Sequence, residues 1–216
     1  MKRRHFSATL TAGLAGLWCV RVAAAPAGSA PVVLIVGDSL SAEYGLRRGS
    51  GWVALLQARL QREGVRAQVV NASVSGDTTA GGRSRLPGLL QQHQPAVVVI
   101  ELGGNDALRG LPLSTTRDNL RAMVRASRAA GARVLLLGMD MPPNYGERYR
   151  AEFRAVYADV AREEQAALVP FFLAGVADGP HAAALFQADR IHPNEDAQPA
   201  MLNNVWPQLR RLLVRG

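Results

Sequence analysis

The chain has 216 residues, of which 48% are hydrophobic and 19% are charged, and its formal net charge is +8. This composition excludes a disordered or fibrous protein, and the length suits one domain with a substantial core. The positive charge does not indicate a nucleic-acid partner, because no basic run with interleaved aromatic residues occurs. The only cysteine is Cys19, so no disulfide, thiolate nucleophile or cysteine metal site is expected in the rest of the chain.

The first 25 residues are typical of a cleaved signal peptide. Met1–Arg4 is basic, Phe6–Val20 is apolar, and Val22–Ala25 supplies small residues for cleavage. The apolar stretch is too short to span a membrane, so no integral membrane segment is expected in the mature chain. Arg3 and Arg4 leave the twin-arginine export route open beside the general secretory route. We therefore predict a periplasmic or secreted protein whose formal charge, without the leader, is about +4.

Residues 26–31 are predicted to be a flexible lead-in, and residues 32–216 a single domain in which strand and helix patterns alternate. The apolar runs typical of buried strands are Val32–Val36, Ala67–Asn71, Ala96–Leu102, Arg133–Gly138 and Ala167–Pro170. The predicted helices are Gly51–Arg62, Thr79–Gln92, Ser114–Ala130, Glu147–Glu164 and Asp196–Val214. This alternation predicts an α/β fold, with a five-stranded parallel sheet between two layers of helices.

In such a fold the carboxyl ends of the strands meet at one edge of the sheet, where ligands bind. Gly37-Asp38-Ser39 follows the first strand, and we expect a helix to follow the serine. A serine hydroxyl becomes a nucleophile only when a base takes its proton. Taken alone, the stretch is more typical of a residue that caps a helix.

Two later strand ends carry candidate donors for an oxyanion. Gly76 follows the second strand, and its backbone N–H is not shielded by a side chain. Asn105 follows the third strand, and its side-chain amide could complete such a site. Each residue alone is also compatible with an ordinary turn or helix cap.

His192 is the best candidate for the base. Asp189 precedes it by three residues, so the carboxylate can accept from one ring nitrogen and leave the other free to take a proton. His93 lies at a polar helix end, and His181 has no acid placed in the same way.

Together, these pieces resemble the four sequence blocks of the SGNH (GDSL) hydrolases, over a span from about Val32 to Arg211. The likeness is greatest to the bacterial periplasmic thioesterase I, lysophospholipase and arylesterase group, and Pro142–Gly146 and His192–Pro199 extend it. The resemblance implies the flavodoxin-like SGNH hydrolase fold, with no cofactor and no metal. We expect a monomer that takes a small-molecule acyl ester or thioester and has no nucleic-acid partner.

The resemblance also implies a role for each candidate residue. Ser39 would be the nucleophile, His192 the general base and then the general acid, and Asp189 the residue that orients His192. The oxyanion hole would consist of the Ser39 N–H, the Gly76 N–H and the Asn105 side chain. Two departures from the family pattern are Glu43 and Ala107, which stand where a small residue and a glycine are common.

The expected activity is that of a serine esterase or thioesterase acting on aryl esters, lysophospholipids or acyl thioesters through an acyl-enzyme on Ser39. An O-acetylesterase for carbohydrate or peptidoglycan would use the same catalytic set, and a non-catalytic acyl-binding protein could keep the same scaffold. Apolar residues near the strand ends favour an acyl chain over a sugar, although each could simply pack in the core. The candidates for the acyl pocket are Leu108, Leu111, Met141, Pro142, Tyr145 and Ile191.

Overall fold

The computed structural model describes residues 30–214. The predicted signal peptide over residues 1–25, and all but the last two residues of the 26–31 lead-in, lie outside the described residues. Within this range, no helix is both long and apolar enough to cross a membrane.

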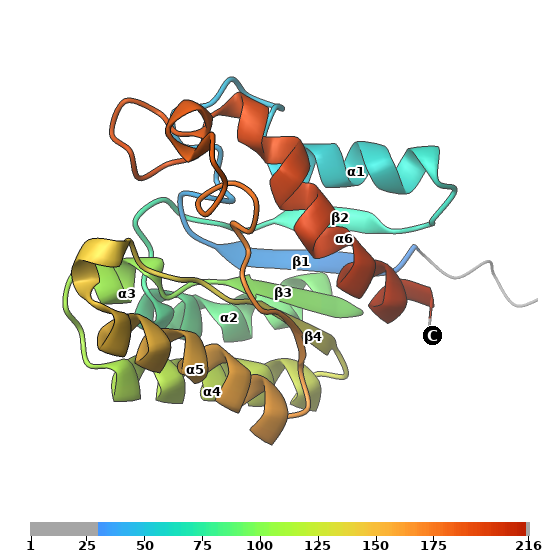
Figure 1. Ribbon diagram of the computed structural model, residues 1–216. Helices are drawn as coiled ribbons and strands as arrows, with labels where there is room; N and C mark the ends of the chain where they lie inside the picture. Colours follow the sequence, from blue (N-terminus) through green and yellow to red (C-terminus); the bar gives the residue numbers. More distant parts are fainter. Residues whose placement is uncertain (1–29, 215–216) are drawn as a thin grey trace, which may run out of the picture.

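Five parallel strands form one sheet in the order β2-β1-β3-β4-β5. The strands are β1 (Val32–Gly37), β2 (Gln68–Asn71), β3 (Val97–Glu101), β4 (Arg133–Leu137) and β5 (Ala167–Val169). Helices α1 and α6 cover one face of the sheet, and α2, α4 and α5 cover the other (Figure 1). The predicted α/β/α sandwich is thus confirmed.

The main helices are α1 (Trp52–Arg62), α2 (Thr79–His93), α4 (Leu113–Ala129), α5 (Glu147–Glu163) and α6 (Gln198–Val214). Every predicted strand and helix is present, and each end lies within two residues of its predicted position. Three 3-10 turns and a short helix were not predicted, namely η1 (Pro143–Tyr145), η2 (Ala182–Leu185), η3 (Glu195–Ala197) and α3 (Gly104–Leu108). These short elements lie in loops, where hydrophobic periodicity carries little signal.

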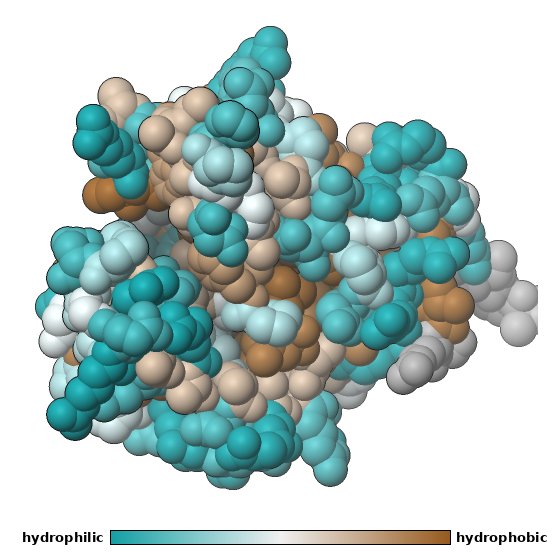
Figure 2. All heavy atoms as spheres, viewed as in Figure 1, coloured by the Kyte–Doolittle hydropathy of each residue, from teal (hydrophilic) through white to brown (hydrophobic). Residues whose placement is uncertain are grey.

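Apolar side chains determine how the layers pack. All five residues of β3 are buried, as expected for a central strand covered on both faces. On α6, Met201, Val205 and Leu209 are buried at four-residue spacing and face the sheet. The outer surface over α5 is hydrophilic, whereas apolar side chains are visible between α5 and α6 (Figure 2). The resulting core holds the ends of the central strands rigidly.

The helix expected to follow Ser39 is α1, and the chain reaches it through a series of turns. Residues 39–45 form successive turns, and the next helix begins only at Trp52. Glu43 has φ +59° and Gly45 has φ +70°, and this left-handed backbone interrupts any helix. The Glu43 carboxylate accepts the Gly51 N–H at 2.8 Å and so satisfies the first free N–H before α1. The departure seen at Glu43 is therefore part of the turn that leads away from Ser39.

The strand order creates a crevice between β1 and β3. The chain leaves β1 towards β2 on one side and returns across the sheet to β3 on the other, so the connections diverge at this point. In register, Gly37 pairs with Glu101. The segments that follow these two residues therefore lie side by side at the carboxyl edge.

A substitution at Gly103, in the turn between β3 and α3, tests how tightly the carboxyl edge of the sheet is packed. Gly103 has φ +120°, and a Cβ there would overlap the buried Tyr157 hydroxyl, which donates to Leu102 O at 3.0 Å. We expect Gly103→Ala to lower the free energy of unfolding by about 2–4 kcal/mol, through backbone strain and overpacking together. Gly110→Ala is the matched control, because Gly110 has φ +65° with open space around it. Equal losses in denaturant unfolding would show that the contact with Tyr157 is unimportant.

Candidate active site

Ser39, His192 and Asp189 form a hydrogen-bonded line at the carboxyl edge of the sheet. His192 Nε2 lies 2.9 Å from Ser39 Oγ, and His192 Nδ1 lies 2.6 Å from Asp189 Oδ2. Ser39 lies two residues after the end of β1, whereas the other two residues lie in the loop before α6. This is the geometry in which a histidine can take a proton from a serine hydroxyl.

Asp189 is held in place by the loop that it orients. Its Oδ1 accepts the backbone N–H of Ile191 at 2.9 Å and that of His192 at 3.0 Å. The hydrogen bonds from the His192 backbone and ring, together with the Ile191 N–H, lower the pKa of Asp189 to about 2. The carboxylate is therefore ionised at neutral pH and accepts the Nδ1 proton, which leaves Nε2 facing the serine.

Further contacts restrict the position of the His192 ring. The Gln187 N–H donates to His192 O at 2.8 Å, and the Arg190 N–H donates to Gln187 O at 2.9 Å. Arg190 has φ +58°, so the chain turns sharply between the two catalytic candidates. The Tyr44 ring packs against the imidazole, with centroids 4.5 Å apart. Sequence patterns did not indicate Tyr44, because its contact with His192 depends on the turns after Ser39.

Two backbone donors expected for an oxyanion are free. Among residues 30–214, the N–H groups of Ser39 and Gly76 have no hydrogen-bond acceptor. Gly76 has φ +77° in the turn between β2 and α2, and its carbonyl accepts from Arg109 at 2.8 Å. Both donors can therefore receive a ligand atom without breaking an internal bond.

The third expected donor, Asn105, is already engaged. Its Nδ2 donates to Asp38 Oδ2 and to the Asp77 carbonyl, both at 3.0 Å. These bonds connect α3 to the turns that carry Ser39 and Gly76. They orient the amide, and both of its protons are engaged within the protein.

A cavity of about 690 Å³ opens beside Ser39 and His192. Four of the six predicted pocket residues line it, namely Leu108, Met141, Pro142 and Ile191. Leu111 and Tyr145 do not. Leu111 turns away after α3 with its N–H bonded to Asp106 O at 2.9 Å, and the Tyr145 ring stacks on Tyr149. Proximity along the chain put these two residues in the prediction, but loop geometry directs them elsewhere.

The cavity also has lining residues that sequence reasoning missed. The apolar ones are Leu40, Met139, Pro143, Phe171, Leu173, Ala177 and Phe186. Arg150 and Asp140 are polar members and pair at 2.7 Å. Burial opposes ionisation of Asp140, but the hydrogen bonds from Arg150 and Arg154 lower its pKa below the ordinary value. The charges of Arg150 and Asp140 compensate each other, and the apolar residues make up most of the wall.

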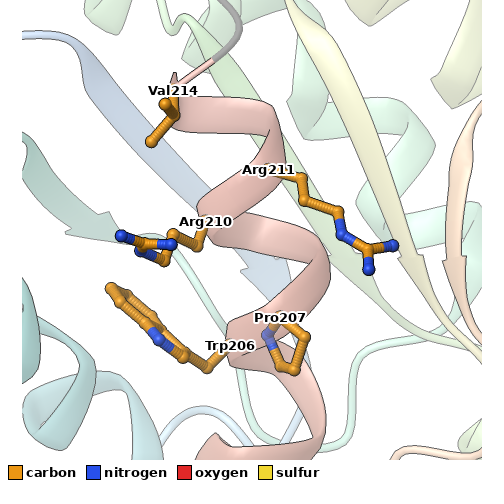
Figure 3. Close-up of a pocket in the computed structure, with 5 residues that line it drawn as sticks. All are labelled: Trp206, Pro207, Arg210, Arg211 and Val214. Atoms are coloured by element: carbon orange, nitrogen blue, oxygen red, sulfur yellow. The ribbon is translucent and has the colours of Figure 1, made fainter.

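A second hollow of about 410 Å³ lies at the far end of α6 (Figure 3). It is lined by Trp206, Pro207, Arg210, Arg211 and Val214. The Arg59 guanidinium lies over the Trp206 ring, 4.6 Å from its centroid. None of these residues is a nucleophile or base, in contrast to Ser39 and His192, which line the larger cavity. Within residues 30–214, no cluster of His, Cys, Asp or Glu is arranged to hold a metal ion.

Comparison with known proteins identifies the family. Residues 35–199 match the model of the GDSL-like Lipase/Acylhydrolase family. The chain belongs to this family. Esterase TesA of Pseudomonas aeruginosa is 56% identical over 185 residues, which cover 86% of this chain and 90% of TesA. Thioesterase 1/protease 1/lysophospholipase L1 of Escherichia coli is 44% identical over 187 residues, which cover 87% of each chain.

Solved structures agree with the family assignment. The crystal structure of TesA superimposes with a TM-score of 0.81 at 56% sequence identity, covering 84% of this chain and 99% of that one. This GDSL-family acylhydrolase therefore shares both sequence and fold with its relatives over nearly their whole length.

Asp189→Asn tests the orienting role of the carboxylate. Asparagine keeps an oxygen for the two backbone N–H groups, but its amide N–H₂ would face Nδ1 and force the imidazole proton onto Nε2. We expect kcat to fall by about 10³–10⁴-fold, because Nε2 can then no longer take the serine proton. Thermal unfolding should show that Asp189→Asn is folded, and retention of the wild-type kcat would contradict the role.

Proposed function

We propose that this protein hydrolyses acyl esters and thioesters through an acyl-enzyme on Ser39. The protein is an ester hydrolase by family, and its relatives are named esterase, thioesterase/lysophospholipase and arylesterase. The observation that carries the proposal is the hydrogen-bonded line from Asp189 through His192 to Ser39, at the mouth of an apolar cavity.

In the first step, Ser39 Oγ attacks the carbonyl carbon while His192 Nε2 takes its proton. The 2.9 Å separation of these atoms allows the transfer without rearrangement of either side chain. The imidazolium that forms is stabilised by the ionised Asp189, 2.6 Å from Nδ1. His192 then gives the proton to the departing alcohol or thiol, which leaves the acyl group on Ser39.

The negative oxygen of the tetrahedral intermediate would bind the N–H groups of Ser39 and Gly76 and the amide of Asn105. The first two are free of internal acceptors, and the third is held by Asp38 and Asp77. Donors fixed before the reaction need no reorganisation when charge develops. In the second step, His192 activates a water molecule that releases the acid and regenerates the hydroxyl.

The cavity favours a longer acyl chain over acetate. Its volume of about 690 Å³ and its mainly apolar wall would enclose a hydrocarbon tail. We propose that Leu108, Met141, Pro142 and Ile191 contact this tail. An acetyl group would leave most of the space filled with water, which disfavours the O-acetylesterase alternative.

The decisive experiment measures hydrolysis of p-nitrophenyl esters from acetate to palmitate. We expect kcat/KM to rise with chain length beyond acetate, and Ser39→Ala to abolish turnover because no nucleophile remains. Asn105→Ala should lower kcat by about 10²–10³-fold through loss of one oxyanion donor. An optimum at acetate would favour the O-acetylesterase, and equal activity of wild type and Ser39→Ala would contradict the mechanism.

We also propose that residues 1–25 direct export of the protein and are then removed. The basic, apolar and small-residue segments in that order support this proposal. N-terminal sequencing of the exported protein should begin at Pro26. An exported protein that begins at Met1 would contradict cleavage.

A further inference from the structure

Glu101 is a buried carboxyl group directly beneath the turn that carries Ser39. It is the last residue of β3, pairs in register with Gly37 of β1, and is 1% exposed. A Cβ on Gly37 would lie 2.8 Å from Glu101 Oε2, so only glycine leaves room for this carboxyl group. No step of the mechanism above uses Glu101.

Glu101 bonds to residues on both sides of the nucleophile. Its Oε2 accepts the Ser41 hydroxyl at 2.8 Å and the Asp38 N–H at 3.3 Å. Ser41 Oγ in turn accepts from Trp52 Nε1 at 3.2 Å, which fixes the direction of its own proton. One side chain of β3 therefore connects the residue before Ser39 to the residue two places after it.

The surroundings of Glu101 favour its neutral form. Burial raises its pKa well above the ordinary value, and the negative charge of Asp38 raises it further. Burial also raises the pKa of Asp38, to about 6, where hydrogen bonds from the Leu40 N–H and from Glu101 restrain the rise. Burial and the neighbouring Asp38 charge thus act together in favour of a protonated Glu101.

The other titratable or charged groups packed around Glu101 do not take over its role, because they bond to other partners. Tyr157 of α5 donates to a backbone carbonyl, and Asp106 of α3 accepts from the α2 N-terminus. Arg85 of α2 donates to the Gly37 carbonyl at 3.2 Å. His192 lowers the pKa of the neighbouring Asp38 by its charge.

Asp38 connects Glu101 to Asn105, the side chain proposed as an oxyanion donor. Its Oδ1 accepts the Leu40 N–H and its Oδ2 accepts Asn105 Nδ2, both at 3.0 Å. An ionised acceptor holds these donors more firmly than a neutral one. We propose that Glu101 is a positioning residue that fixes Asp38 and Ser41 and through them Ser39 and Asn105. This inference rests on the proposed function of Ser39.

Two substitutions separate this role from simple packing. Glu101→Gln keeps an oxygen for Ser41 and the Asp38 N–H and presents an N–H to the Asp38 carboxylate, but it has no proton to lose. We expect it to retain a kcat close to the wild type at neutral pH. Glu101→Ala should lower kcat by about a hundredfold with little change in KM, because the nucleophile and the oxyanion donor lose their alignment.

The pH profile of kcat distinguishes a positioning role from a merely structural one, because a structural role would leave the profile unchanged. In the wild type, alkaline pH removes the Glu101 proton, and the two adjacent carboxylates then repel each other. We therefore expect an alkaline decline in kcat that is absent in Glu101→Gln. Glu164→Gln is the matched control, since Glu164 is also a buried glutamate but pairs with Arg125, away from the cavity. Identical alkaline declines in wild type and Glu101→Gln would overturn the proposal.

Infrared spectroscopy gives a second test that needs no activity. At neutral pH the wild type should show the C=O stretch of a protonated carboxyl group, which Glu101→Gln lacks and Glu164→Gln retains. A wild-type spectrum without this band would overturn the proposal even if a variant failed to fold. If Ser39→Ala were as active as the wild type, the proposed function would fail, whereas the infrared result would still report on Glu101.

Discussion

The pairing of β1 with β3 is the constraint on which the site depends. It places Gly37 opposite Glu101 at the point where the chain diverges to both sides of the sheet. The segments that follow these strands must therefore meet, and they carry Ser39 and, in α3, Asn105. Buried strands covered on both faces cannot slide without exposing apolar side chains, so the register also determines the spacing of these groups.

Three carboxyl groups near Ser39 differ in pKa because their surroundings differ. Asp189 lies near solvent and accepts several hydrogen bonds, which lower its pKa to about 2. Asp38 is buried and only partly compensated, so its pKa rises to about 6. Glu101 is buried next to that charge, and its pKa is raised well above the ordinary value. The same carboxyl chemistry thus acquires different pKa values according to burial and neighbours.

Loops account for the differences between the sequence prediction and the structure. The turns after Ser39 depend on Glu43 and Gly45 in left-handed conformations, which hydrophobic periodicity does not reveal. The same limit applies to the pocket, where Leu108 lines the cavity but Leu111, three residues later, does not. Glu101 did leave a signal, because a charged residue ending an otherwise apolar strand is unusual unless it has a partner.

The sequence by itself determined the order of strands and helices and the residue types that end each strand. Apolar spacing within short windows is sufficient for these features. The sequence also contains the Gly-Asp-Ser, Gly-Asn-Asp and Asp-x-x-His blocks of the family. Only the tertiary structure decided that His192 reaches Ser39 across 153 positions, that Glu101 lies beneath the nucleophile, and which apolar side chains face the cavity. Contacts between residues so distant in sequence depend on how the layers pack, which local patterns do not specify.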